Sequence, residues 1–108
     1  MDQQTLKKAL NLLGMATRAG KLVSGEEQVL TAIQRNKVFC VICATDSSPK
    51  TVKKIQNKCQ HYEIPFIQPF DSATISQAIG KNRSICGISD KGFSKSLLGM
   101  EGITIMKI

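Results

Sequence analysis

Apolar residues recur with a helical period in some segments of the chain and without interruption in others, and the two kinds of segment alternate. Residues 3–18 are predicted to form a helix because four apolar residues fall at i, i+3, i+4 and i+7: Leu6, Ala9, Leu10 and Leu13. Gly20 ends this helix, and residues 21–24 leave room only for a short strand. Residues 38–44 are apolar at every position, as expected for a strand covered by helices on both faces, so this strand should be central in the sheet.

Capping residues mark where the next two helices begin. Ser24, with Glu27 three residues later, forms a capping-box pattern and predicts a helix to about residue 35 with an inner face of Val29, Ala32 and Ile33. Ser48 followed by Pro49 predicts the start of a third helix, whose buried stripe contains Val52, Ile55 and Cys59.

Short strands and capped helices also make up the second half of the chain. Residues 65–68 are predicted to form a third strand, and Asp71 caps a helix that Gly80 ends. Residues 84–89 form a fourth strand, after which Asp90 opens the last helix.

Helices and short strands therefore alternate along the whole sequence. This order predicts an α/β protein, a three-layer α/β/α sandwich with a small four-stranded sheet that is mixed or mainly parallel. The length of 108 residues suits one domain spanning residues 1–108. Residues 100–108 are either a tail or an added strand.

The chain carries a large positive charge. Its 15 Lys and Arg residues against 8 Asp and Glu residues give a net charge of +7 and an isoelectric point near 9.5. Such an excess favours a polyanionic partner, either nucleic acid or, less directly, an anionic membrane face. The 4 Phe and 1 Tyr are not interleaved with basic residues, so the chain has few aromatic side chains on which bases could stack as they do in RRM or OB-fold proteins. We interpret one stripe of cations, opposite the buried face of the third helix, as a solubilising surface rather than a binding patch: Lys50, Lys53, Lys54 and Lys58.

The sequence has no pattern of a membrane span or a secretory signal. The longest apolar run, residues 38–44, is far shorter than the roughly 18 residues that a spanning helix needs. The first residues carry the acid Asp2 where a signal peptide has basic residues, and no apolar region follows. We therefore expect a cytoplasmic protein with no membrane partner.

The cysteines and the single histidine do not form a pattern that favours catalysis or metal binding. Cys40 and Cys43 form a C-x-x-C motif, but residues three apart in a strand point to opposite faces, so the two sulfurs should not converge. We interpret all four cysteines as reduced core residues. His61 has no nucleophile or acid as a partner and is interpreted as an exposed loop residue. We expect no catalytic residue, no metal and no cofactor.

The most promising binding site is the turn between the strand 21–24 and the helix that follows it. A strand that enters a helix through Ser24 and Gly25 presents backbone N–H groups and the positive end of the helix dipole, which suit an anion. Arg18 and Lys21 flank this turn and Lys37 follows the helix, so basic side chains would gather on one side. The alternative is that the acids in the first turn only stabilise their own helix and that the cations are solvated surface.

Three segments are characteristic together with the apolar strand 38–44: residues 18–25 (RAGKLVSG), 65–67 (PFI) and 84–90 (SICGISD). Together they resemble the archaeal and eukaryotic kink-turn-binding ribosomal protein superfamily, in particular its bacterial YlxQ-type members. The resemblance covers about residues 3–98 and implies the same α/β/α fold.

The resemblance also implies where RNA would bind. In that superfamily, the turn that corresponds to residues 25–31 enters the widened groove of a kinked RNA helix, where an Asn-Glu pair contacts guanines of sheared G·A pairs and a Lys supports them. Gly25 matches the family glycine, whereas Glu27, Gln28 and Thr31 stand where Asn, Glu and Lys are usual. Ionised Glu27 only accepts hydrogen bonds, and Glu27 or Gln28 would supply the acceptor that guanine N1–H and N2–H₂ require.

A second loop of the superfamily, which corresponds here to residues 80–85, covers an extruded nucleotide with small and apolar side chains. In this chain the loop is basic, which favours contact with the RNA backbone. The complete set of candidate RNA-binding residues is Arg18, Lys21, Ser24, Gly25, Glu27, Gln28, Thr31, Lys37, Lys81, Asn82, Arg83, Ser84 and Ile85.

Three functions are compatible with these observations. The first is a non-catalytic RNA-binding protein, ribosomal or ribosome-associated, that recognises kinked or bulged RNA as a monomer through the strand-to-helix turn at residues 21–28 and the loop at residues 80–85. Its partners would be ribosomal RNA or another kink-turn-like RNA, and ribosomal proteins. The second is a protein–protein adaptor on the same scaffold that has lost kink-turn recognition, because the Asn, Glu and Lys positions are altered. The third, a thiol redox or zinc protein, would use Cys40 and Cys43, and we expect instead no metal and slowly reacting thiols.

Overall fold

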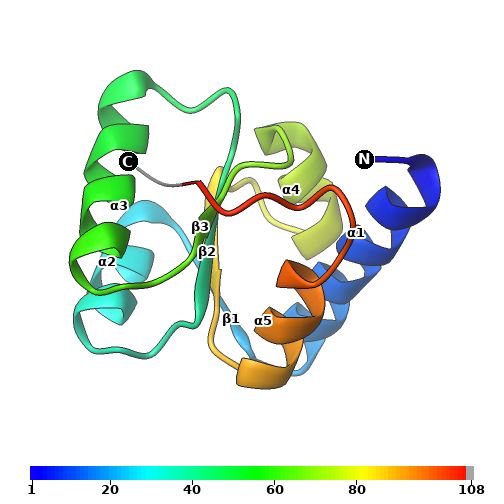
Figure 1. Cartoon of the computed structure of the whole chain (residues 1–108), viewed down its shortest axis with the longest axis horizontal. Coiled ribbons are helices and arrows are strands. Elements are labelled where there is room, and N and C mark those ends of the chain that lie inside the picture. The colour runs from blue at the N-terminus through cyan, green and yellow to red at the C-terminus, as the bar shows by residue number, and fades with distance from the viewer. Residues whose placement is uncertain (107–108) are drawn as a thin grey trace.

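The computed structural model describes residues 1–106, which form five helices and four strands in alternation (Figure 1). In chain order they are α1 (Gln3–Arg18), β1 (Leu22–Ser24), α2 (Glu26–Gln34), β2 (Cys40–Cys43), α3 (Pro49–His61), β3 (Phe66–Ile67), α4 (Ser72–Ile79), β4 (Ile85–Ile88) and α5 (Lys91–Leu98). The predicted three-layer sandwich is confirmed, since α2 and α3 lie on one side of the strands and α1, α4 and α5 on the other.

Most predicted helix boundaries are confirmed because they depend on short-range capping. Asp2, Ser48, Asp71 and Asp90 each accept a hydrogen bond from a backbone N–H three residues later, at the starts of α1, α3, α4 and α5. Gly80 ends α4 in the left-handed conformation, with φ of 77°.

The sheet has the strand order β1-β4-β2-β3, so β2 is internal as predicted. β4 pairs antiparallel with both β1 and β2, and only β2 and β3 are parallel. The mixed form of the prediction is therefore confirmed and the mainly parallel form is wrong. The reason lies in where the chain re-enters the sheet after α4. The chain returns from α4 at the end where β2 leaves the sheet, since the Ala44 N–H donates to the Ser84 carbonyl over 2.8 Å, and β4 must run back against β2.

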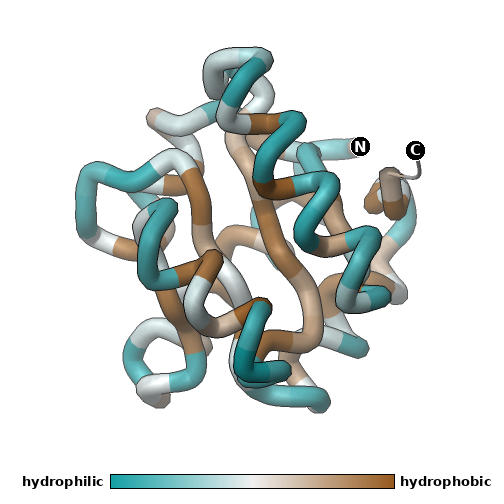
Figure 2. The backbone as a smooth tube through the Cα atoms, turned by 90° about the vertical axis from the view of Figure 1, so that its left-hand side faces the viewer, coloured by the Kyte–Doolittle hydropathy of each residue, from teal (hydrophilic) through white to brown (hydrophobic). Residues whose placement is uncertain are grey.

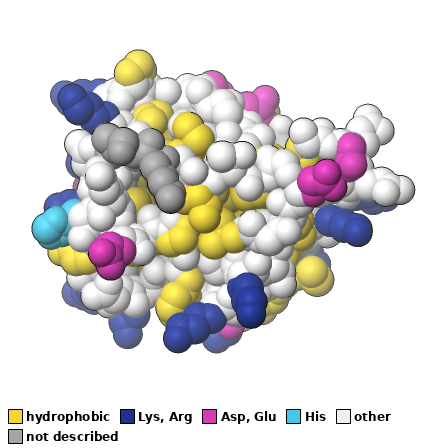
Figure 3. Space-filling model, viewed as in Figure 1, with side chains coloured by type: hydrophobic (Ala, Val, Ile, Leu, Met, Phe, Trp, Pro, Cys, Tyr) yellow, Lys and Arg dark blue, Asp and Glu magenta, His cyan; other side chains and the backbone are white. Residues whose placement is uncertain are grey.

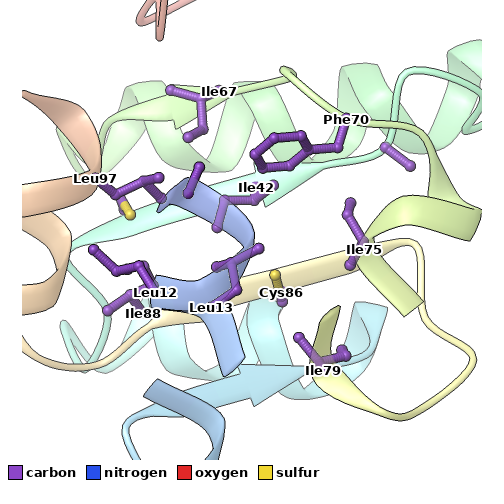
Figure 4. Packing of buried hydrophobic residues seen from close by; sticks show 13 residues of the cluster. Leu12, Leu13, Ile42, Ile67, Phe70, Ile75, Ile79, Cys86, Ile88 and Leu97 are labelled. Carbon is purple, nitrogen blue, oxygen red and sulfur yellow. The ribbon is translucent and has the colours of Figure 1, made fainter. Parts of the chain in front are cut away.

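The core divides into two layers because side chains of the central strand alternate between its faces. Cys40 and Ile42 point toward α1, α4 and α5, while Val41 and Cys43 point toward α2 and α3. Figure 4 shows the first layer, in which Leu12 and the other labelled apolar side chains converge between the sheet and its helices. Figure 2 looks onto the second side, where α2 and α3 lie in front of the strands and hydrophilic positions recur along the outside of α3.

The segment after α5 lies along the β3 edge. Ile105 forms an antiparallel bridge with Ile67, and the Met106 N–H donates to the Phe66 carbonyl over 2.7 Å. Residues 100–106 are thus neither a free tail nor a full strand, and the remainder of the predicted segment, residues 107–108, lies outside the described residues. Over residues 1–106, no helix has the length and apolar character needed to cross a membrane.

Candidate nucleic-acid interface

Three helices begin at the same edge of the sheet. β1, β2 and β3 run in one direction, and each is followed by a helix, α2, α3 or α4. Side-chain contacts tie these helix starts together: the Glu26 carboxylate accepts from the Thr51 hydroxyl at 3.4 Å and pairs with the Lys54 ammonium at 3.2 Å. Asp46 accepts hydrogen bonds from the N–H and hydroxyl of Ser72 at 2.8 and 2.7 Å. The positive ends of the three helix dipoles therefore lie along one edge, where an anion is stabilised.

Gly25 forms the tip between β1 and α2 and brings it against the loop before β4. Its φ of 98° and ψ of 148° lie where residues with a Cβ atom are strained. The Gly25 N–H donates to the carbonyl of Ile85 over 2.9 Å, and a Cβ atom on Gly25 would lie 3.7 Å from Nε of Arg83. The same Cβ atom would lie 2.6 Å from Oε1 of Gln28, so the Gln28 side chain folds over the glycine. The structure thus places Gly25, Gln28 and Arg83 together; we call this group the tip cluster.

The predicted capping box at the start of α2 is wrong. Ser24 is still part of β1, where it pairs with Cys86 of β4, and the N-cap is Gly25, which has no side chain to accept a hydrogen bond. Among the five helices in residues 1–106, α2 alone starts without a side-chain cap. The acid that was expected to cap, Glu27, is exposed. The N–H groups of the first turn of α2 are therefore not capped by a protein side chain.

The loop between α4 and β4 is fixed by a single serine. The Ser76 hydroxyl accepts from the Arg83 N–H and donates to the Arg83 carbonyl, both at 2.9 Å. The Arg83 guanidinium donates to the carbonyl of Asn82 at 2.9 Å, while Lys81 and Asn82 are exposed. Ser84 is half-buried. The backbone of this loop is thus held in place while its cationic side chains face outward from it or lie beside Gly25.

One member of the predicted loop site, Ile85, is not at the surface. Its side chain is only 2% exposed and packs in the core layer under α2 and α3. Ile85 is the first residue of β4, and the strand's alternation directs its side chain inward, so only its backbone carbonyl reaches the tip. As a direct contact to RNA through its side chain, the Ile85 prediction is corrected.

A shallow hollow of about 480 Å³ runs beside α2, and four predicted residues line it together: Glu27, Gln28, Thr31 and Lys37. The same hollow is lined by three residues that the sequence analysis did not select, namely Val23, Ala32 and Arg35. Helical spacing would have identified Arg35, the C-cap residue of α2, which follows Thr31 by four residues. We call this surface the α2 hollow; it meets the tip cluster at Gln28, which belongs to both.

Two predicted cations lie elsewhere. Arg18 lines a groove of about 660 Å³ between α1 and α4, and its Nη1 would be 3.4 Å from a Cβ atom on Gly14. Lys21 precedes β1 whereas Gly25 follows it, so the two lie at opposite ends of the strand, about 13 Å apart at 3.3 Å per residue. The expectation that Arg18 and Lys21 would flank the tip is therefore wrong, although Lys37 joins the α2 hollow.

The four cysteines are free and buried, and the structure places Cys40 and Cys43 in different core layers, as predicted. Burial raises the pKa of the Cys40 thiol to about 11 and that of Cys59 to about 12, and it raises the pKa of Cys86 as well. Within residues 1–106, no three His, Cys, Asp or Glu side chains gather as a metal site. His61 is exposed as predicted, but it is the last residue of α3 and not part of a loop.

Known proteins similar to this chain share both its sequence and its fold. Residues 7–98 match the family described as Ribosomal protein L7Ae/L30e/S12e/Gadd45. The RNA-binding protein YlxQ of Enterococcus faecium is 44% identical over 95 residues, which cover 88% of this chain and 92% of that protein.

Two solved structures also superimpose on the fold. A protein of unknown function from Bacillus halodurans C is 43% identical, with a TM-score of 0.81 over 83% of this chain and 92% of its own. The Giardia lamblia 15.5kD RNA binding protein has the same fold at only 17% identity, with a TM-score of 0.79 over 92% of this chain and 88% of its own. The predicted resemblance is thereby confirmed, and the chain belongs to the ribosomal protein L7Ae/L30e/S12e/Gadd45 family.

Proposed function

We propose that this chain is a non-catalytic, cytoplasmic RNA-binding protein, ribosomal or ribosome-associated, which recognises kinked or bulged structured RNA as a monomer. The family, the name of the Enterococcus faecium relative and the net charge of +7 support RNA as the ligand. The observation that carries the proposal is the uncapped start of α2, held beside Arg83 by the hydrogen bond between Gly25 and Ile85. The RNA contacts are the tip cluster, the exposed side chains of Lys81 and Asn82, the half-buried Ser84 and the α2 hollow.

Phosphate groups suit the tip cluster for two reasons. The first turn of α2 offers backbone N–H groups and the positive end of the helix dipole, and Gly25 has no side chain to keep a phosphate away from them. Arg83 adds a guanidinium group beside the same glycine, with a fork of donors that matches a phosphate. Gln28 folds over Gly25 with its Oε1 nearest the glycine, which suits a donor group of a base, and its Nε2 donates to an incoming phosphate once the side chain turns.

Base recognition falls to the polar side chains of the α2 hollow. A phosphate is repelled by the exposed Glu27 carboxylate, but the N1–H and N2–H₂ groups of guanine need an acceptor and suit it well. The Thr31 hydroxyl, one turn further along α2, donates or accepts beside it. In this proposal the altered positions, Glu27, Gln28 and Thr31, retain guanine contacts with chemistry that differs from the usual Asn, Glu and Lys.

The proposal is tested with purified protein and two labelled RNAs, a duplex with a three-nucleotide bulge and a straight duplex with the same stems. Fluorescence anisotropy should give tighter binding to the bulged RNA. Arg83→Gln should weaken that binding and flatten its logarithmic salt dependence by about one unit, because one phosphate contact is lost. Lys95→Gln, on the exposed face of α5, removes the same charge and should leave the preference unchanged.

Equal binding of both RNAs, or an Arg83→Gln variant that behaves as the unaltered chain does, would overturn the proposal. In that case a pull-down whose protein partners survive nuclease treatment would support the adaptor function instead.

A further inference from the structure

The first turns of α3 carry cations that the proposed RNA site does not use. Lys50, Lys53 and Lys54 are exposed, and Lys50 lies at the very start of the helix, at the sheet edge where the tip lies. Lys54 pairs with Glu26, the residue that directly follows Gly25. One side-chain contact therefore separates the tip from the lysines of α3.

Two of these three lysines have no acidic partner within residues 1–106. Within the described part of the chain, Lys54–Glu26 is the only ion pair, so Lys50 and Lys53 have no acidic partner there. The pair leaves the side chain of Lys54 56% exposed, so its ammonium still faces solvent. In Figure 3, Lys and Arg side chains appear along the left edge, on the side where Figure 1 places α2 and α3. Lysines on adjacent turns of a helix repel one another, and a polyanion relieves that repulsion.

We propose that the first turns of α3, with Lys50, Lys53 and Lys54, form a second contact that binds the phosphate backbone of an RNA stem next to the bend held at the tip. This surface deepens the proposed function and depends on it. Glu26 acts as a positioning residue, since its contacts with Thr51 and Lys54 fix the start of α3 against the start of α2. The lysines are point charges without base-reading geometry, so the contact adds affinity and sets how the stem leaves the tip, without selecting a sequence.

The test compares the double variant Lys50→Gln/Lys53→Gln with Lys8→Gln/Lys95→Gln, which removes the same charge from exposed sites on α1 and α5, in the other helical layer. All four residues are exposed, so both variants should keep the fold, which circular dichroism checks. With the bulged RNA described above, the α3 variant should flatten the logarithmic salt dependence by about two units and the control by much less. Shortening the stem on one side of the bulge should abolish the difference between the α3 variant and the unaltered chain.

The outcomes separate the two proposals. One outcome is that bulged RNA binds, that Arg83→Gln weakens this binding and that the α3 variant behaves like its charge-matched control. This outcome refutes the α3 contact and leaves the proposed RNA contact at the tip supported. If no RNA preference exists for the unaltered chain, the proposed function fails and the α3 contact fails with it. A protein partner whose capture is lost in the α3 variant and survives nuclease would also overturn the inference.

Discussion

Replacing Gly25 by alanine tests the geometry on which the site is built. Its backbone, at φ 98° and ψ 148°, lies in a region that is nearly exclusive to glycine, where another residue costs roughly 1–3 kcal/mol. The new Cβ atom would also come within 2.6 Å of Oε1 of Gln28, but that atom is the end of an exposed, flexible side chain and can rotate away. We therefore expect Gly25→Ala to lower the free energy of unfolding by about 1–2 kcal/mol, after the gain from restricting the unfolded chain.

Gly80 provides a matched control. It also has a positive φ, 77°, but in the left-handed helical region, and a Cβ atom there would meet nothing within 4 Å. Alanine costs about 1–2 kcal/mol in that conformation, and the roughly 0.4–1 kcal/mol regained by restricting the unfolded chain is common to both alanine variants. Gly80→Ala should therefore destabilise the protein clearly less than Gly25→Ala does.

Urea unfolding followed by circular dichroism measures both variants, and the shift in the transition midpoint reports stability as long as the slope is unchanged. Gly25→Ala should also weaken binding of the bulged RNA by about tenfold, which is about 1.4 kcal/mol, because the Cβ atom stands beside the first turn of α2 and Gln28 is displaced from the tip. Equal urea midpoints for the two alanine variants would refute the argument from the strained tip.

Three further predictions concern the surroundings of the tip. Ser76→Ala leaves the N–H and carbonyl of Arg83 without their partner. Urea unfolding should show a loss of about 1–3 kcal/mol in stability, and RNA affinity should fall because the loop is less firmly held. Unchanged stability and unchanged RNA affinity would contradict the hydrogen-bond pattern. The pKa values of the Asp46 and Asp71 carboxyl groups lie below the usual 3.8. The largest cause is a side-chain hydrogen bond, from Ser72 to Asp46 and from Thr74 to Asp71. The stability that these two ionised carboxylates contribute is therefore present above pH 3.8 and is lost as the pH falls below about 4. The melting temperature should fall in that pH range, and it should fall less steeply in Asp46→Asn. The raised pKa values predict that the cysteines react slowly with a thiol reagent at pH 8 in the folded protein and rapidly in guanidinium, and fast reaction without denaturant would count against burial.

The sequence predicted those parts of the fold that depend on neighbouring residues. The caps at Asp71 and Ser48 and the helix stop at Gly80 were correct because each is decided within four residues. The direction of β4 was not predictable in the same way, since it follows from a contact between residues 44 and 84. The capping box at Ser24 failed for a related reason: pairing with β4 keeps Ser24 in the strand, and this tertiary contact overrides the local signal.

The candidate site shows the same division. Glu27, Gln28 and Thr31 share one hollow because helical spacing places them on one face of α2. The sequence analysis placed Arg18 and Lys21 beside Gly25 because they are close to it in sequence. In the structure, Arg18 ends α1 and lines the groove between α1 and α4, and the strand β1 separates Lys21 from Gly25. The link from Glu26 to Lys54 joins residues 28 apart, and no pattern in the sequence marks it.

The most direct measurement of the central claim is a titration of isotopically labelled protein with the bulged RNA, followed by NMR of the backbone amides. The account predicts the largest shifts at residues 25–28 and 81–84, with smaller ones along the start of α3 and none beyond noise in α5. Shifts concentrated in the groove between α1 and α4, or no shifts at residues 25–28, would contradict it.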